Sequence, residues 1–179
     1  MPKIITEREK KIREIYKKFP KRPYISEENN LKTTVPYRNM IPVSEDLVPG
    51  DIILLWRINF RTFTTESPFP KYFEYDYGIN ARENLQKLID NGYVFIESTF
   101  DSMRHVTAKF LKDIFKREGF KGISALKKEE LEELAINTFT EERMSTEFSI
   151  RGYALTYKGK VALEKHRYIV NKHPQKVMK

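Results

Sequence analysis

Residues 107–139 read TAKFLKDIFKREGFKGISALKKEELEELAINTF, and this stretch decides the fold class. The first half predicts an amphipathic helix that ends at Gly119. Its apolar side chains lie on one side of that helix: Phe110, Leu111, Ile114 and Phe115. Ser124 is a plausible N-cap for a second helix. The buried stripe of the second helix is then Leu126, Leu131, Leu134 and Ala135. We therefore predict a helical hairpin with a short connection.

The segments before this hairpin predict further helices and a short strand. DIILLWRINF (51–60) is predicted as a helix, although its β-branched and aromatic residues also allow a strand. One or two helical turns are expected in PKYFEYDYG (70–78), and a helix is expected between Asn80 and Gly92. YVFIE (93–97) has the alternation of a strand.

The C-terminal part predicts a second strand and another helix. Residues 138–150 are polar without a strong period, so no element is expected there. GYALT (152–156) predicts a strand, a helix begins at Thr156 and continues over YKGKVALEKH, and YIV (168–170) is strand-like. The predicted fold class is therefore α+β, mainly α.

The composition narrows the classes of function. The chain has 179 residues, 40% of them hydrophobic, which is enough to bury a real core. It has no cysteine, which excludes disulfides, thiol nucleophiles and thiolate metal sites. No apolar run approaches the length of a membrane span, and the first residues lack the apolar segment of a signal peptide. We expect a cytoplasmic protein without membrane contact.

Enzyme signatures are missing from the sequence. There is no Gly-rich phosphate loop, no Gly-x-Ser-x-Gly and no His-Glu-x-x-His. His105 and His166 are expected to be surface or capping residues. No catalytic residue, metal or cofactor is predicted, and we expect that the protein is not an enzyme.

Positive charge gathers at the two ends of the chain. The formal net charge is +8, with +6 over residues 1–24 and +7 over residues 151–179, so the middle is mildly acidic. An amphipathic helix is predicted over residues 4–19, followed by a Pro-rich surface connection or linker up to residue 50. Such basic ends favour contact with a polyanion, although they also aid solubility.

The connection inside the hairpin has a recognisable pattern. An apolar helix is followed by Gly, an apolar residue, Lys-Gly, an aliphatic residue and Ser, and then by Leu, two basic residues and Glu-Leu. The residues that carry it are Gly119, Phe120, Lys121, Gly122, Ile123, Ser124, Leu126, Lys127, Lys128, Glu130 and Leu131. The pattern resembles the helix–extended loop–helix unit at the N-terminus of the transcription terminator Rho and, more loosely, the related SAP domain. The resemblance implies binding of DNA in the SAP type, or of single-stranded nucleic acid in the Rho type.

The same stretch is physically suited to a phosphate. Its basic side chains fall within thirteen positions: Lys116, Arg117, Lys121, Lys127 and Lys128. Gly122 lets the backbone approach a ligand, and a helix that starts at Ser124 would add free N–H groups. Such contacts bind regardless of base sequence. The alternative is a structural or protein-docking hairpin, because the glutamates at 129, 130, 132 and 133 would repel a nucleic-acid backbone.

The segments around the hairpin resemble a winged-helix domain. LQKLIDNGYVFIE (85–97) is similar to a recognition helix that runs into a strand, and GYALTYKGKVALEKH (152–166) is similar to the returning strand and C-terminal helix. In this resemblance the three helices of the domain are residues 51–60, 70–77 and 80–91. The third helix is then implied to present polar side chains outward to base edges or phosphate. They are Arg82, Asn84, Gln86 and Lys87, and Lys158 and Lys160 would add electrostatic attraction.

The combined layout is similar to a group of uncharacterised SAP-containing proteins of Gram-positive bacteria and their phages. These proteins share Tyr-Phe-x-x-x-Tyr-Gly-Ile, here residues 72–79, and Leu-Thr-x-x-Gly, here residues 155–159. They also share a later Tyr-Ile-Val, here residues 168–170, and a histidine, here His173. This similarity informs the fold more than the function.

Together these patterns predict four parts of the chain. They are a basic N-terminal region (1–50), a winged-helix-like body (51–97 and 151–170), an inserted helix–extended loop–helix hairpin (98–150) and a basic tail (171–179). We expect a non-catalytic protein that binds DNA, with single-stranded nucleic acid as the other candidate ligand. The alternative is an interaction adaptor that uses the same modules to dock a protein.

Overall fold

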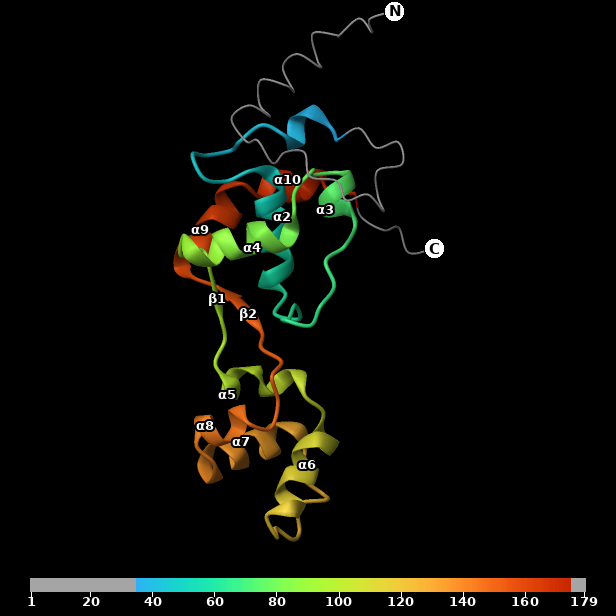
Figure 1. Ribbon diagram of the computed structural model, residues 1–179, viewed down its shortest axis with the longest axis vertical. Coiled ribbons are helices and arrows are strands. Elements are labelled where there is room, and N and C mark those ends of the chain that lie inside the picture. The colour runs from blue at the N-terminus through green and yellow to red at the C-terminus, as the bar shows by residue number, and fades with distance from the viewer. Residues whose placement is uncertain (1–34, 175–179) are drawn as a thin grey trace, which may run out of the picture. The chain divides into compact units, whose positions relative to one another are not determined.

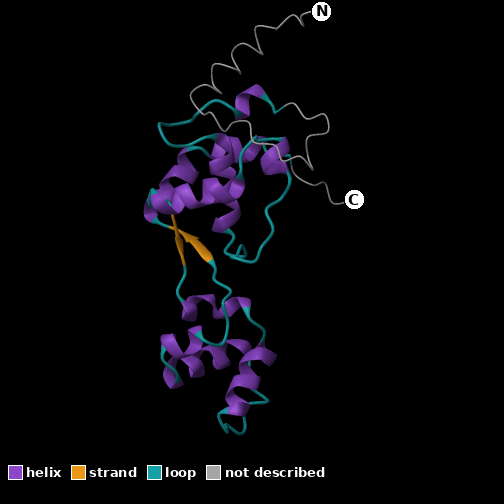
Figure 2. Ribbon diagram, in the orientation of Figure 1, coloured by secondary structure: helices purple, strands orange, loops and turns teal. Residues whose placement is uncertain are grey.

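The computed structural model describes residues 35–174, and over this range it is a mainly helical α+β structure with one pair of short strands (Figures 1 and 2). The predicted helix at 4–19 and the end of the basic tail lie outside the described residues. The described chain divides into two compact units. Unit 1 contains residues 35–59, 68–94 and 155–174, and unit 2 contains Phe60–Ser67 and Phe95–Ala154.

Helix α2 (Pro49–Asn59) is the centre of unit 1 and confirms the helical alternative for this segment. It is apolar on nearly all sides, and its buried aliphatic side chains are Ile52, Ile53, Leu54, Leu55 and Ile58. Such a helix has to be surrounded by other elements, and α2 packs against α4, α9 and α10. The other elements of unit 1 are η2 (Tyr37–Asn39), α3 (Tyr72–Tyr75), α4 (Ala81–Asp90), α9 (Tyr157–Lys165) and α10 (Arg167–Lys172).

Several local signals in the sequence are confirmed. The Asn80 side chain caps α4 by accepting a hydrogen bond from the Glu83 amide at 3.3 Å. Gly92 follows this helix with φ = 79°. Strands β1 (Val94–Ile96) and β2 (Tyr153–Leu155) occur where they were predicted, and they pair with each other. The winged-helix resemblance implies this pairing, but the resemblance itself stays a prediction.

One expectation for unit 1 was wrong, and one open alternative is decided. The strand-like YIV segment is part of helix α10, where Ile169 and Val170 are buried. Of the two alternatives for the Pro-rich segment, the described part is not a free linker, because Met40 and Leu47 are buried in the core. In both segments, apolar side chains pack in the core of unit 1.

The Leu-Thr-x-x-Gly pattern has a structural explanation in unit 1. Thr156 Oγ1 accepts a hydrogen bond from the Gly159 amide at 3.0 Å, which caps α9, and donates to the Gly92 carbonyl at 2.6 Å. A Cβ at position 159 would lie 2.1 Å from the Tyr93 carbonyl oxygen. Glycine is therefore required where α9 approaches the backbone just before β1.

Unit 2 is a helical unit with its own core. Its helices are α5 (Thr99–Ser102), η3 (Met103–His105), α6 (Ala108–Arg117), α7 (Lys128–Thr138) and α8 (Glu141–Ser145). Its buried core residues are Met103, Leu111, Ile114, Phe115, Ile123, Leu131, Ala135, Met144 and Phe148. The predicted hairpin helices α6 and α7 pack against each other. Helix α8 was not expected, although Thr140 caps it by accepting from the Arg143 amide at 3.1 Å.

Candidate nucleic-acid interface

Helix α6 carries lysines on the side opposite its buried face. Thr107 caps the helix by accepting from the Phe110 amide at 3.1 Å, and the apolar side packs into the core of unit 2. Lys109, Lys112 and Lys116 are spaced by three and four residues, so they share one face. Lys109 and Lys116 are exposed. The sequence interpretation included Lys116 but missed the other two lysines, which the helical spacing could have identified.

The loop between α6 and α7 is anchored by its apolar residues and open elsewhere. Phe120 packs edge-on against Phe115 with ring centroids 5.3 Å apart, and Ile123 is buried. Gly119 and Gly122 have φ values of 84° and 77°, and nothing lies within 4 Å of a Cβ added to either residue. The loop backbone at these two glycines is therefore accessible to a ligand.

The start of α7 corrects the prediction that Ser124 caps the second helix. The helix begins at Lys128, and Lys127 occupies the N-cap position without a side-chain hydrogen bond. A turn precedes it, in which the Leu126 amide donates to the Ile123 carbonyl at 3.1 Å. This turn lets Ile123 and Leu126 pack on the core before the helix starts. The Ser124 carbonyl instead accepts from Lys112 Nζ at 3.0 Å.

The acidic side chains of α7 occupy the positive end of its dipole. Glu129 and Glu130 lie in the first turn and are exposed. Carboxylates at this end stabilise a helix, and they compete there with a phosphate. The expectation that the N–H groups of this helix face an anion is therefore weakened, and α6 with the loop is the more favourable surface.

The five basic side chains of the predicted grip fall into two groups. Lys116, Lys121 and Lys127 are exposed and have no hydrogen-bond or ion-pair partner among residues 35–174. Arg117 pairs with Glu147 at 2.6 Å. Lys128 pairs with Glu132 at 3.1 Å and donates to the Arg104 carbonyl at 3.2 Å. Three of the five cations are thus available to a ligand at no cost in existing contacts.

An ion-pair network ties the end of α6 to α8. Arg143 pairs with Glu118 at 2.5 Å and also with Glu147, which accepts the hydrogen bond from Arg117. That bond from Arg117 lowers the pKa of Glu147, and Arg143 adds to the effect against the opposing influence of burial. These ion pairs connect the end of α6, where the loop begins, to α8.

Three of the predicted contact side chains in unit 1 already have hydrogen-bond partners in the same unit. Asn84 was expected to face outward, but its Nδ2 donates to Asp51 Oδ1 at 2.9 Å. Gln86 donates to Asp90 at 2.9 Å. Lys158 Nζ donates to the Asn91 carbonyl at 2.8 Å and lies 4.2 Å from the centroid of the Tyr93 ring. Contact of these side chains with base edges would therefore compete with these hydrogen bonds.

Other predicted cations of unit 1 are exposed. Lys87 and Lys160 have no hydrogen-bond or ion-pair partner in the described part of the chain. The Arg82 guanidinium lies 5.7 Å from the centroid of the Phe69 ring. The unit therefore offers isolated positive charges rather than an assembled recognition helix.

Unit 2 contains a buried charge cluster that was not predicted from the sequence. Glu97 has a side chain only 2% exposed, and it pairs with Arg104 and, at 3.2 Å, with Arg61. Burial would raise the pKa of Glu97, but the hydrogen bonds and charges of the two arginines outweigh it and lower the pKa. No periodicity predicts this cluster, because Arg61 is 36 residues away from Glu97 and no regular element spans Glu97 and Arg104.

The histidines are more buried than expected. His105 Nε2 is buried and has no hydrogen-bond partner among residues 35–174, and burial, with Arg104 nearby, lowers the pKa of His105. His166 does occupy a cap position between α9 and α10, but it is also buried. Over residues 35–174, no group of three or more His, Cys, Asp or Glu side chains could hold a metal ion.

Comparison with known proteins gives no assignment. No family model, no curated protein and no solved structure matches this chain. Within the described range, no helix has both the length and the apolar character needed to span a bilayer.

Proposed function

We propose that unit 2 binds nucleic acid without catalysis, with duplex DNA as the first candidate. The observation that carries the proposal is a set of three exposed lysines, Lys116, Lys121 and Lys127, which are unpaired within residues 35–174 and surround a loop with two accessible glycines. Ammonium groups on an open loop suit phosphate oxygens, and they contribute affinity without reading bases. The lysine face of α6 extends the positive surface.

Phosphate contact is favoured over base readout by the side chains that are already engaged. Asn84 and Gln86 of α4 are the amides that could pair with adenine edges, and both are hydrogen bonded to carboxylates within unit 1. Little sequence preference is therefore expected. A single strand with the same phosphates is the second ligand to test, because the Rho-type resemblance points to it.

A salt titration tests the proposal. The full chain is titrated onto a short duplex and a matching single strand over a range of salt concentrations. Three phosphate contacts give a log–log slope of roughly −3 on the duplex. The double variant Lys121→Ala with Lys127→Ala should flatten this slope by about 2.

The matched control removes the same charge elsewhere. Lys71 and Lys165 are exposed lysines of unit 1 that belong to no predicted contact, and their double alanine variant should keep the wild-type slope. If both double variants flatten the slope equally, attraction is diffuse and the loop is not the contact. If neither does, the proposal fails.

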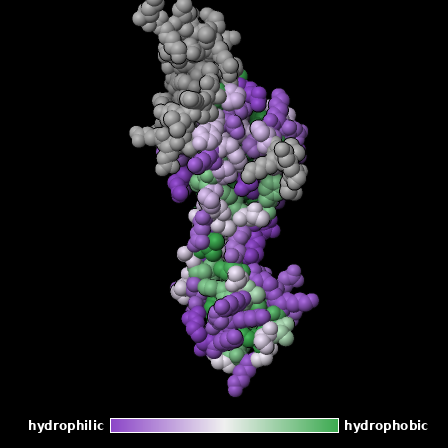
Figure 3. Space-filling view, turned by 90° about the vertical axis from the view of Figure 1, so that its right-hand side faces the viewer, coloured by the Kyte–Doolittle hydropathy of each residue, from purple (hydrophilic) through white to green (hydrophobic). Residues whose placement is uncertain are grey.

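The adaptor alternative is supported by exposed apolar side chains. In unit 2 they are Phe60, Phe95, Ile96 and Ile136, each at least 45% exposed. On the face drawn in Figure 3, hydrophobic patches lie among the hydrophilic ones. Single exposed apolar residues are normal, whereas a contiguous patch marks a docking surface. Salt-insensitive capture of a protein partner that is lost in Ile136→Asp would favour this alternative over DNA binding.

A further inference from the structure

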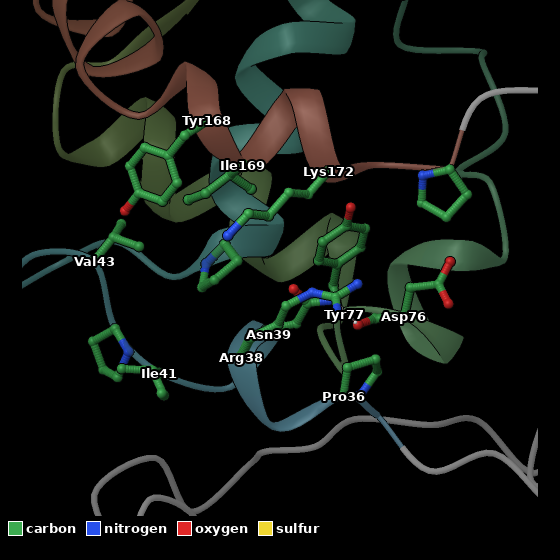
Figure 4. A pocket seen from close by; sticks show the side chains of 13 residues that line it. Pro36, Arg38, Asn39, Ile41, Val43, Asp76, Tyr77, Tyr168, Ile169 and Lys172 are labelled. Atoms are coloured by element: carbon green, nitrogen blue, oxygen red, sulfur yellow. Dashed lines mark hydrogen bonds between the residues drawn. The ribbon is translucent and has the colours of Figure 1, made fainter.

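Unit 1 contains a pocket that the proposed function does not use. Its volume is about 340 Å³, and its lining comes from three segments of unit 1: residues 36–49, residues 76–77 and residues 168–174 (Figure 4). A volume of this size is within the range of small-molecule sites. None of the lysines of the proposed DNA contact belongs to it.

Part of the pocket wall is apolar and suited to a flat ring. Tyr168 and Ile41 line the pocket, and they are 51% and 40% exposed, so the neighbouring residues leave part of each side chain uncovered. The Tyr77 ring forms another part of the lining. Four prolines also line the pocket and restrict its backbone: Pro36, Pro42, Pro49 and Pro174. Aromatic and proline faces pack well on a planar ligand.

The charged groups of the pocket are unequal. Arg38 and Lys172 extend toward its interior, and Asp76 lies on the side away from Tyr168 (Figure 4). Neither cation has a hydrogen-bond or ion-pair partner in residues 35–174, although Lys172 Nζ lies 5.9 Å from the centroid of the Tyr168 ring. Two cations without a partner in the described residues favour an anionic group on the ligand, and the Asp76 carboxylate can accept hydrogen bonds from N–H or O–H groups of the ligand.

The floor beneath the pocket is preorganised. The Tyr77 hydroxyl is hydrogen bonded to His173 Nδ1 at 2.6 Å. The His173 ring also contacts Tyr72 and Trp56, with centroid distances of 4.6 Å and 5.5 Å. A rigid floor reduces the entropy lost on binding. Trp56 is the single tryptophan of the chain, so its fluorescence can report on the pocket.

We propose that this pocket binds one nucleotide. The base lies against the exposed ring of Tyr168 above the floor at Tyr77, the phosphate is held by Arg38 and Lys172, and Asp76 accepts hydrogen bonds from the sugar or the base. The nucleotide has two sources, a free mononucleotide or the phosphorylated end of a strand. Both present the same ring and phosphate.

Titration of the full chain with 5′-AMP, followed by Trp56 fluorescence, tests the proposal. Saturable binding below about 1 mM is expected. Adenosine, which lacks the phosphate, and inorganic phosphate, which lacks the ring, should each bind at least about tenfold more weakly. Absence of saturation with AMP, GMP and UMP overturns the proposal, as does equal binding of adenosine and AMP.

Single charge-removing variants locate the site. Lys172→Gln and Arg38→Gln should each weaken AMP binding about tenfold, and Lys172→Arg should restore most of it. Lys165→Gln, an exposed lysine at the end of α9 outside the pocket, is the matched control and should change nothing. Equal losses in Lys165→Gln and Lys172→Gln would overturn the proposal.

Two further titrations separate this site from the DNA contact and identify the source. The Lys121→Ala, Lys127→Ala variant should bind AMP as the wild type does, so loss of DNA binding leaves this proposal standing. If binding of a 5′-phosphorylated single strand depends on Lys172, the natural ligand is the phosphorylated end of a strand. A strand that binds independently of Lys172, while AMP depends on it, indicates the free mononucleotide.

Discussion

Helix α4 in unit 1 and the α6–α7 hairpin in unit 2 both carry polar side chains that the sequence predicts to contact nucleic acid. In α4, Asn84 and Gln86 are hydrogen bonded to carboxylates of their own unit. In the hairpin, Lys121 and Lys127 have no such partner in the described chain. The difference teaches that a donor is available to a ligand only where the fold has not already used it.

The largest effect on stability is expected at the closest backbone approach in unit 1, between Gly159 and Tyr93. Gly159→Ala places a Cβ 2.1 Å from the Tyr93 carbonyl oxygen, and the backbone has to move. We expect a loss of more than about 3 kcal/mol in the free energy of unfolding, measured by urea denaturation. An unchanged midpoint would show that α9 does not approach Tyr93 closely.

The same substitution in the hairpin loop is the control. Gly122→Ala meets no neighbour, so only its φ of 77° opposes the new side chain. The expected loss is about 1 kcal/mol. Equal losses at the two glycines would remove the contrast between a close approach and an open loop.

A second prediction concerns the buried carboxylate of unit 2. Glu97→Gln removes the charge that Arg104 and Arg61 share, and it should cost about 2 kcal/mol at neutral pH. Because the folded-state pKa of Glu97 is lowered, its stabilisation is present above the unfolded pKa, near 4.5, and is lost as pH falls through the folded value.

The pH dependence separates this charge effect from a simple packing defect. Urea midpoints of the wild type and Glu97→Gln should converge as pH falls below about 4.5. Arg61→Gln is the milder comparison, since the Arg61 side chain is 61% exposed and screened by solvent. A gap that stays constant with pH contradicts the assignment.

The smallest effects are predicted for two single lysine variants, one of which should change only the stability and the other only the DNA binding. Lys158→Ala removes a hydrogen bond to Asn91 and should lower the free energy of unfolding by about 0.5 kcal/mol while leaving the DNA salt slope unchanged. Lys121→Ala should leave stability unchanged and flatten the slope by about 1. Parallel measurements on the two variants check this, and a reversed outcome would exchange the roles of the two units.

Local signals were predicted well because they depend on neighbouring residues. Asn80, Thr156 and Gly92 delimit helices as expected, since capping and positive φ are properties of a few consecutive residues. The start of α7 was not predicted, because Ser124 is as good a cap in sequence as any other serine. The structure passes over it because Ile123 and Leu126 pack on the core of unit 2 first.

The basic residues of the candidate site were predicted from the sequence, but which of them are free to contact a ligand was not. The lysine pattern around Gly122 is visible in the sequence, and Lys116, Lys121 and Lys127 are exposed as the proposal requires. Arg117 and Lys128 are instead engaged by Glu147 and Glu132. Glu132 follows Lys128 by four residues, so helical spacing could have identified that pair. The Glu147 partner is thirty residues away from Arg117, so no local pattern identifies it.

The sequence by itself determined the helical character of the chain, most helix ends and the charge on the hairpin loop, because these depend on periodicity, capping and composition over a few residues. Only the tertiary structure decided which charged side chains are held in ion pairs or hydrogen bonds and where α9 contacts the Tyr93 backbone. It also decided that Arg38, Lys172 and Tyr168 line one pocket. Those facts join residues that are distant in the chain, and only packing of the core brings such residues together.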